Sequence, residues 1–127
     1  MNWITREQVR QAAREGNLEA AKVSLRHWRQ IFRVSRKQFI DAQNNDKVNT
    51  GARFCAFCER NSTGIDCMNC PLKSPQKNKG CGNGSYYVKA YCATMDFQYS
   101  RITKKQHQEQ LLPLVNRIKG IVEKLSV

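Results

Sequence analysis

The sequence lacks any apolar run of the roughly 18 to 20 residues that a membrane-spanning helix needs. Its first residues, Met1 to Gln8, also lack the apolar core of a signal peptide. We therefore expect a cytoplasmic protein that is not attached to a membrane. In the cytosol thiols stay reduced, so paired Cys-x-x-Cys units there more often bind metal than form disulfides.

Acidic residues are scarce as well. Lys and Arg number 22 against 10 Asp and Glu, which gives a formal net charge of +12. A surface this basic attracts polyanions such as nucleic acid or the acidic surface of another protein, although it says nothing about the fold. The sign of the charge excludes an acidic mimic of DNA. The alternative interpretation is a basic surface that only keeps the protein soluble.

The sequence also lacks the residue patterns that are typical of catalytic sites. The two histidines, His27 and His107, have no second histidine or acid at the spacing of a metal hydrolase, and no glycine-rich phosphate-binding loop occurs. A thioredoxin-like site would be one Cys-x-x-Cys pair within a βαβ pattern, which is also lacking. The sequence therefore predicts that the protein is not an enzyme. An active site assembled from distant residues is the alternative.

What is present begins with a short amino-terminal helix. Thr5 and Gln8 have the form of a capping box, in which each residue satisfies a backbone amide of the other. This pattern predicts a helix over residues 6–15, which Gly16 ends.

A longer second helix is expected from Leu18 to about Ala42, where the polar cluster 44–46 follows. Apolar residues recur there at three- and four-residue steps and so share one face. They are Leu18, Ala21, Leu25, Trp28, Phe32 and Phe39. Trp28 and Phe32 are expected in the core, whereas His27 lies off this face and is expected at the surface.

Two further helices are predicted after the cysteine-rich middle. Residues 86–95 are expected to form a helix capped by Ser85, with a strand as the alternative. Thr103 and Gln106 form a capping box for a carboxy-terminal helix, and Pro113 either kinks that helix or marks the first turn of a shorter one. Its apolar seam is Leu111, Val115, Ile118, Val122 and Leu125. Such a seam needs a partner helix, and a homodimer formed through it is one interpretation.

The middle of the chain contains two Cys-x-x-Cys pairs with eight residues between them. Tetrahedral zinc needs four ligands, and each pair supplies two thiolates from one tight turn. The predicted ligands are Cys55, Cys58, Cys67 and Cys70. A closed site of four thiolates leaves no position for a reactive water, so this zinc is predicted to be structural. An iron–sulfur cluster or disulfides are the competing interpretations.

Cys81 and Cys92 complete the six cysteines. Cys81 lies in a glycine-rich loop, residues 79–84, and is a possible replacement ligand for Cys67 or Cys70. Cys92 lies in an aromatic segment and is expected to be a small buried apolar residue.

Basic residues line one face of the second predicted helix. They follow one another at three- and four-residue steps: Lys22, Arg26, Arg29, Arg33 and Arg36, with Lys37 beside them. Like charges stacked in this way repel each other unless an anion neutralises them, and arginine suits bidentate contacts with phosphate. Arg53 and Arg60 flank the cysteines and extend the predicted binding surface. A solvated face without a ligand is the alternative.

A resemblance to a known family rests on four features of the sequence: the pair His27–Trp28, the pair Cys55 and Cys58, the segment Cys67–Pro71, and Cys81. In these residues the chain resembles small, uncharacterised phage and prophage proteins, over roughly residues 18–91. The resemblance implies a phage origin, and hence the cytoplasm of a host bacterium, together with a zinc-binding middle. It also favours Cys81 as a metal ligand, and it implies almost nothing about activity.

The sequence thus predicts one mainly α domain over residues 1–127 with an irregular zinc-binding middle. A basic helical hairpin occupies 1–46, zinc-knuckle-like loops occupy 47–84, and a helical tail occupies 85–127. The first functional hypothesis is nucleic-acid binding through the basic face, largely by phosphate contacts. The second is an interaction protein that binds and modulates a host protein or defence complex. The third is a structural homodimer.

Overall fold

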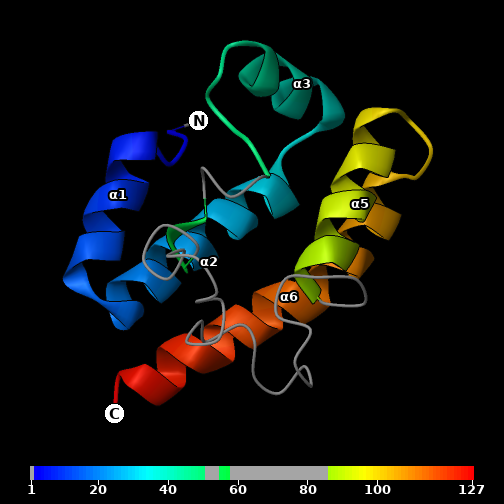
Figure 1. Ribbon diagram of the computed structural model, residues 1–127. Coiled ribbons are helices and arrows are strands. Elements are labelled where there is room, and N and C mark those ends of the chain that lie inside the picture. The colour runs from blue at the N-terminus through cyan, green and yellow to red at the C-terminus, as the bar shows by residue number, and fades with distance from the viewer. Residues whose placement is uncertain (1, 51–54, 58–85) are drawn as a thin grey trace.

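Helices make up most of the described chain (Figure 1). The computed structural model describes residues 2–50, 55–57 and 86–127. Its helices are α1 (Arg6–Glu15), α2 (Asn17–Arg33), α3 (Arg36–Asn44), α5 (Tyr86–Gln98) and α6 (Lys104–Leu125), and no strand occurs within these residues. The mainly α class is therefore confirmed for this part of the chain. Most of the predicted zinc-binding segment, 47–84, lies outside the described residues.

Both predicted capping boxes are confirmed. Thr5 Oγ1 accepts a hydrogen bond from the Gln8 amide at 3.1 Å, and Gln8 Oε1 accepts one from the Thr5 amide at 2.8 Å. Thr103 and Gln106 exchange the same pair of bonds at the start of α6, at 3.1 and 2.9 Å. Each box satisfies amides that have no partner within the helix, which fixes where α1 and α6 begin.

The prediction of one continuous helix to Ala42 is wrong. α2 ends at Arg33, because Val34 is extended, with φ −74° and ψ 155°, and is buried with 1% of its surface exposed. Ser35 then caps α3 through a third capping box with Gln38. A cap residue has non-helical backbone angles, so this box starts a new helix rather than continuing α2. α3 ends at Asn44, at the polar cluster where the sequence predicted an end.

α2 is the central helix of the described fold (Figure 1). α1 packs on α2, α6 packs on both α2 and α5, and α3 contacts α5. One apolar cluster takes residues from all five helices and from Cys55–Phe57. Trp28 is buried in it, as predicted, whereas Phe32 is half-buried at its edge.

The apolar seam of α6 finds its partner helices within the chain. Leu111, Val115 and Ile118 are buried, since α6 packs against α2 and α5, whereas Val122 is half-buried and Leu125 is 39% exposed. The buried part of the seam is therefore already used in the fold and does not offer a free surface for a homodimer.

α6 is the longest of the described helices, with 22 residues, and it includes Pro113 in its interior. The alternative that Pro113 marks the first turn of a shorter helix is therefore wrong. Neither α6 nor another helix in the described part of the chain is long and apolar enough to cross a membrane.

Candidate nucleic-acid interface and cysteine segment

Four of the predicted basic residues form a single row along α2, which we call the basic stripe. They are Lys22, Arg26, Arg29 and Arg33. Their steps of four, three and four residues keep them on one side of the helix, opposite the buried residues Ala20, Ser24 and Ile31. At 1.5 Å per residue the stripe is about 16 Å long. Arg29 is half-buried and the other three are exposed.

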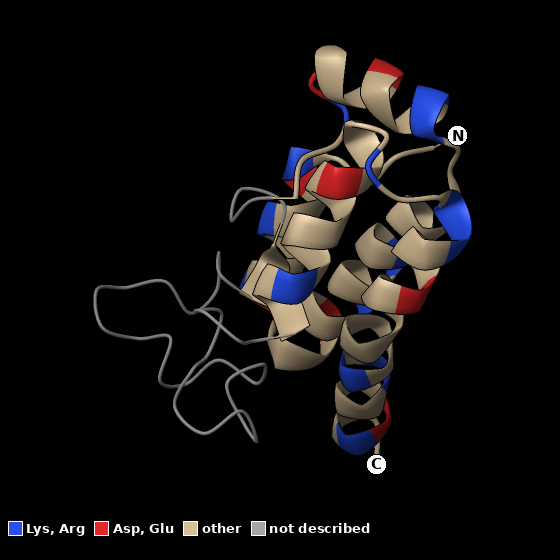
Figure 2. Cartoon of the chain, turned by 90° about the vertical axis from the view of Figure 1, so that its right-hand side faces the viewer, with Lys and Arg blue, Asp and Glu red and all other residues tan. Residues whose placement is uncertain are grey.

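The basic stripe is little neutralised by the protein itself. Lys22 forms an exposed ion pair with Glu19, at 3.3 Å, which contributes little. Within residues 2–50, 55–57 and 86–127 the side chains of Arg26, Arg29 and Arg33 make no hydrogen bond or ion pair. Figure 2 shows further Lys and Arg residues on several of the helices.

Arg36 was predicted to belong to this face, but its guanidinium is engaged within the fold. Its Nε donates to the Phe97 carbonyl at 2.6 Å, and its Nη2 donates to the Ile102 carbonyl at 2.9 Å. The guanidinium also lies 5.0 Å from the centre of the Phe97 ring. Arg36 therefore holds α3 to the end of α5 and to the loop before α6. Lys37, the next residue, is exposed.

A basic residue that the sequence did not single out lies at the carboxyl end of the stripe. Lys104, in the first turn of α6, donates from Nζ to the Arg33 carbonyl at 2.8 Å, and Gln108 donates to the Phe32 carbonyl at 2.9 Å. These carbonyls are among the last four of α2, which have no partner within the helix. The contact adds the positive charge of Lys104 beside Arg33.

His27 is buried, with 2% of its surface exposed, so its predicted surface position is wrong. Its ring packs edge-on against Trp28, with centroids 5.5 Å apart, and Trp28 packs edge-on against Tyr87. Burial lowers the pKa of His27 to about 4, against a smaller opposing effect of a hydrogen bond with the Asn49 backbone. Tyr87 in turn donates to the Thr50 carbonyl. The His27–Trp28 pair thus fastens the segment that leads into the first cysteine pair.

The described part of that cysteine pair lies in the core. Cys55, Ala56 and Phe57 are at most 5% exposed and belong to the main apolar cluster. The other predicted ligands and two predicted binding residues lie outside the described residues: Cys58, Cys67, Cys70, Cys81, Arg53 and Arg60. Within the described ranges no three His, Cys, Asp or Glu side chains gather into a metal-binding group.

Cys92 is exposed on α5, so the prediction that it is buried is wrong. α5 is apolar or aromatic on nearly all sides, and a helix of that composition does not reveal from sequence which side faces the core. Packing against α6 buries Ala90, Ala93 and Phe97. This leaves Cys92 on the opposite side.

His107 is a second buried histidine that the sequence did not assign to the core. Its ring stacks on Phe97, with centroids 4.3 Å apart, and its Nε2 lies 2.9 Å from Thr94 Oγ1. The Thr94 hydroxyl donates its one hydrogen to the Ala90 carbonyl, so Nε2 of His107 must donate to Thr94. Burial lowers the pKa of His107 to about 4. The ring is therefore neutral near pH 7, with its hydrogen on Nε2.

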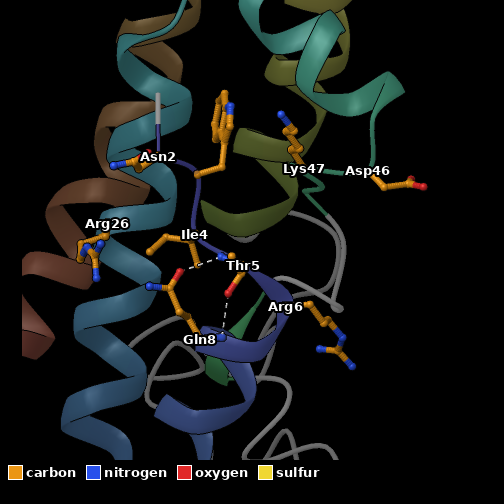
Figure 3. Close-up of a pocket in the computed structure, with 9 residues that line it drawn as sticks. Asn2, Ile4, Thr5, Arg6, Gln8, Arg26, Asp46 and Lys47 are labelled. Atoms are coloured by element: carbon orange, nitrogen blue, oxygen red, sulfur yellow. Dashed lines mark hydrogen bonds between the residues drawn. The ribbon is translucent and has the colours of Figure 1, made fainter.

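The basic stripe borders a groove of about 660 Å³ (Figure 3). The groove lies between the residues before α1, the middle of α2 and the segment after α3. Its lining is residues 2–6, Gln8, Arg26, Asp46 and Lys47. No sequence motif predicted it, because its walls come from three segments that are distant in the chain.

Comparisons with models of known families, with curated proteins and with solved structures gave no match. The functional proposal therefore depends on the residues and their geometry.

Proposed function

We propose that the protein binds nucleic acid through the basic stripe, extended by Lys37 and Lys104 and by Arg53 and Arg60 near the cysteines. One observation carries the proposal. The arginines of the stripe point away from the core, in a row, without a partner among the described residues. A protein with a formal net charge of +12 that leaves such a row unpaired has a strong attraction for a polyanion.

The stripe suits phosphate better than an isolated carboxylate. Arginine donates two parallel hydrogen bonds to phosphate oxygens, and a row of arginines repeats this contact along a backbone. Double-stranded nucleic acid carries about one negative charge per 1.7 Å, so the roughly 16 Å of the stripe meets a length that holds about ten phosphates. Contacts of this kind give affinity without sequence preference.

We also propose that a structural zinc ion stabilises the protein, held by Cys55, Cys58, Cys67 and Cys70, with Cys81 as a possible replacement. The burial of Cys55 in the core supports this part of the proposal, since a ligand there ties any bound metal to the fold. Zinc in a closed thiolate site supplies folding energy and no reactive water. The proposal therefore includes no catalytic activity.

The test is a fluorescence-polarisation titration with short DNA and RNA at two salt concentrations. We expect binding that weakens steeply with salt. For a duplex, each phosphate contact should add about 0.9 to the steepness with which the logarithm of the binding constant falls against the logarithm of the salt concentration. A triple variant that reverses the three arginines of the stripe should bind nucleic acid at least tenfold more weakly, with a smaller dependence on salt. Its substitutions are Arg26→Glu, Arg29→Glu and Arg33→Glu.

The matched control reverses the same number of charges elsewhere. Lys89→Glu, Lys119→Glu and Lys124→Glu together change exposed residues of α5 and α6 and leave α2 intact. If both triple variants lose affinity equally, total charge and not the stripe determines binding. If the unchanged protein binds nothing at low salt, the proposal fails.

A second function is favoured by a different observation. Tyr91, Met95 and Tyr99 are 37%, 38% and 60% exposed at α5 and just beyond it. Aromatic residues and methionine are enriched in protein interfaces. We propose as the alternative that the chain docks on a host protein or defence complex, which fits the resemblance to phage proteins. Recovery of one partner by the unchanged protein, lost in Tyr91→Ser and Met95→Ser, would support it.

A further inference from the structure

The groove beside the basic stripe has the size of a small-molecule site. Its volume of about 660 Å³ lies within the roughly 300 to 1,000 Å³ that such sites occupy. Trp3 lines it, and Trp3 also lines a neighbouring hollow of about 210 Å³ beside α3. Trp3 is half-buried: it packs against the core cluster and also lines the groove.

Trp3 is held in place by a side chain of α2. Gln30 Oε1 accepts a hydrogen bond from the Ile4 amide at 2.9 Å, and Gln30 Nε2 donates to the Asn2 carbonyl at 2.5 Å. These bonds fix the backbone on both sides of Trp3. The indole is therefore presented by a rigid backbone, which lowers the entropy cost of stacking a ligand on it.

The groove is positively charged. Among the described residues that line it, Arg26 comes from α2, Lys47 from the segment after α3 and Arg6 from α1, and Asp46 supplies a carboxylate. In the view of Figure 3, Arg26 lies on one side of Ile4 and Gln8, and the other two cations lie on the opposite side. A ligand in the groove therefore meets Arg26, Lys47 and the aromatic side chain of Trp3.

We infer that this groove binds an unpaired nucleotide of a single strand, with its base on Trp3 and its flanking phosphates beside Arg26 and Lys47. Cationic grooves with aromatic platforms are how proteins hold single strands without sequence preference, because every base has a face that stacks. A paired base is already stacked within the duplex and does not offer that face. Arg26 belongs both to the basic stripe and to the groove, so a strand can pass from one to the other. The inference rests on the proposed function and adds a preference for unpaired bases to it.

The test compares a 12-nucleotide oligothymidylate with a 12-base-pair duplex. Trp3→Ala should weaken single-strand binding about 5- to 150-fold, the effect of losing one stacked base, and change duplex binding less than twofold. Trp3→Phe should restore most of the single-strand affinity. The oligothymidylate should also quench the fluorescence of Trp3, and this change should be absent in Trp3→Phe. Trp28 stays in the core and contributes a constant background.

Exposed cations give a second measurement that does not disturb the core. Arg26→Gln and Lys22→Gln both remove one charge from the stripe, but only Arg26 lines the groove. For the duplex the two variants should lose affinity alike, whereas for the single strand Arg26→Gln should lose several-fold more. Lys47→Gln should weaken single-strand binding alone.

Equal effects of these variants on single strands and duplex would overturn the inference and leave the proposed function standing. The same holds if Trp3 fluorescence does not change while the oligothymidylate binds. Absence of binding to either probe would instead overturn the proposed function, and the inference with it.

Discussion

Arg33 and Arg36 continue the same helical spacing in the sequence, but their guanidinium groups have different surroundings in the fold. Arg33 ends α2 with an exposed side chain, whereas Arg36, three positions on, bonds two carbonyls of a distant segment. The break at Val34 and Ser35 makes this difference, because it turns α3 away from the line of α2. A periodic pattern of charges therefore identified the stripe but could not show where it stops.

Arg36→Gln should lower the free energy of unfolding by about 2 kcal/mol. The substitution removes two charge-assisted hydrogen bonds and a cation–π contact, and it leaves the Phe97 and Ile102 carbonyls without that donor. Urea unfolding followed by circular dichroism measures the change. Lys37→Gln, at an exposed neighbour, should change stability by less than about 0.5 kcal/mol. Equal stability of the two variants would show that Arg36 does not act as a clamp.

Because two histidines are buried, we expect the free energy of unfolding to fall in acid. Each folded-state pKa is lowered from 6.5 to about 4 by burial, so the unfolded chain binds protons more readily in this range. The stability is fully present above pH 6.5 and is lost as the pH falls toward 4, by on the order of 3 kcal/mol for each histidine. Unfolding in urea at half-unit steps of pH measures it.

His107→Gln separates this effect from the titration of carboxylates. The amide of glutamine can still donate toward Thr94 Oγ1, but it does not titrate. The variant should be less stable at pH 7, because it loses the stacking on Phe97, and its stability should fall less steeply between pH 6.5 and 4. An unchanged slope would mean that His107 titrates normally in the fold.

At the scale of whole helices, the junction between α1 and α2 depends on one glycine. Gly16 has φ 132° and ψ 179°, a region of backbone space that is essentially restricted to glycine. Gly16→Ala should therefore destabilise the protein by about 1 to 3 kcal/mol, although nothing lies within 4 Å of the added methyl group.

Gly120 is the matched control for this substitution. It lies within α6, is exposed, and likewise has nothing within 4 Å of an added methyl group. Because alanine favours a helix more than glycine, Gly120→Ala should stabilise the protein by up to about 1 kcal/mol. Thermal unfolding of both variants measures the pair. If both shift the midpoint in the same direction, the backbone strain assigned to Gly16 is wrong.

Local signals predicted the helices well where a cap accompanied the pattern. The boxes at Thr5 and Thr103 set the starts of α1 and α6, and the helix predicted over residues 86–95 extends to Gln98. The missed break had the same signal, since Ser35 and Gln38 form a box of the same kind. The apolar periodicity of residues 18–39 did not reveal the break between α2 and α3, because Val34 at the break is itself apolar and Phe39 beyond it is still buried.

At the scale of the molecule, the sequence could predict chemistry along one helix but not between segments. The basic stripe follows from spacing alone. The groove does not, because Trp3, Arg26 and Lys47 come from the segment before α1, from α2 and from the segment after α3, and they meet only in the folded chain. His27 and Cys92 were misplaced for the same reason. Which side of a helix is buried is decided by segments distant in the chain: the Asn49 backbone contacts His27, and α6 packs on the side of α5 opposite Cys92.

If the proposed zinc ion is bound, we expect the stability of the whole molecule to depend on metal. Structural zinc supplies on the order of 10 kcal/mol in zinc-finger peptides, which is comparable with the entire stability of a small domain. Because Cys55–Phe57 lies in the same core as the five helices, loss of the metal should destabilise the helices as well as the cysteine segment. We expect about one zinc per chain by atomic emission and a large fall in the unfolding temperature after chelation.

Cys55 and Cys92 offer a matched pair for this prediction. Cys55→Ser removes a proposed ligand from the core, so it should abolish zinc binding and lower the unfolding temperature as chelation does. Cys92→Ser changes an exposed thiol outside the proposed site and should retain both the metal and the stability. Equal zinc content in the two variants would exclude Cys55 as a ligand. An iron signal with visible absorption in place of zinc would instead identify the site as an iron–sulfur cluster, bound by the same thiolates and equally tied to the core.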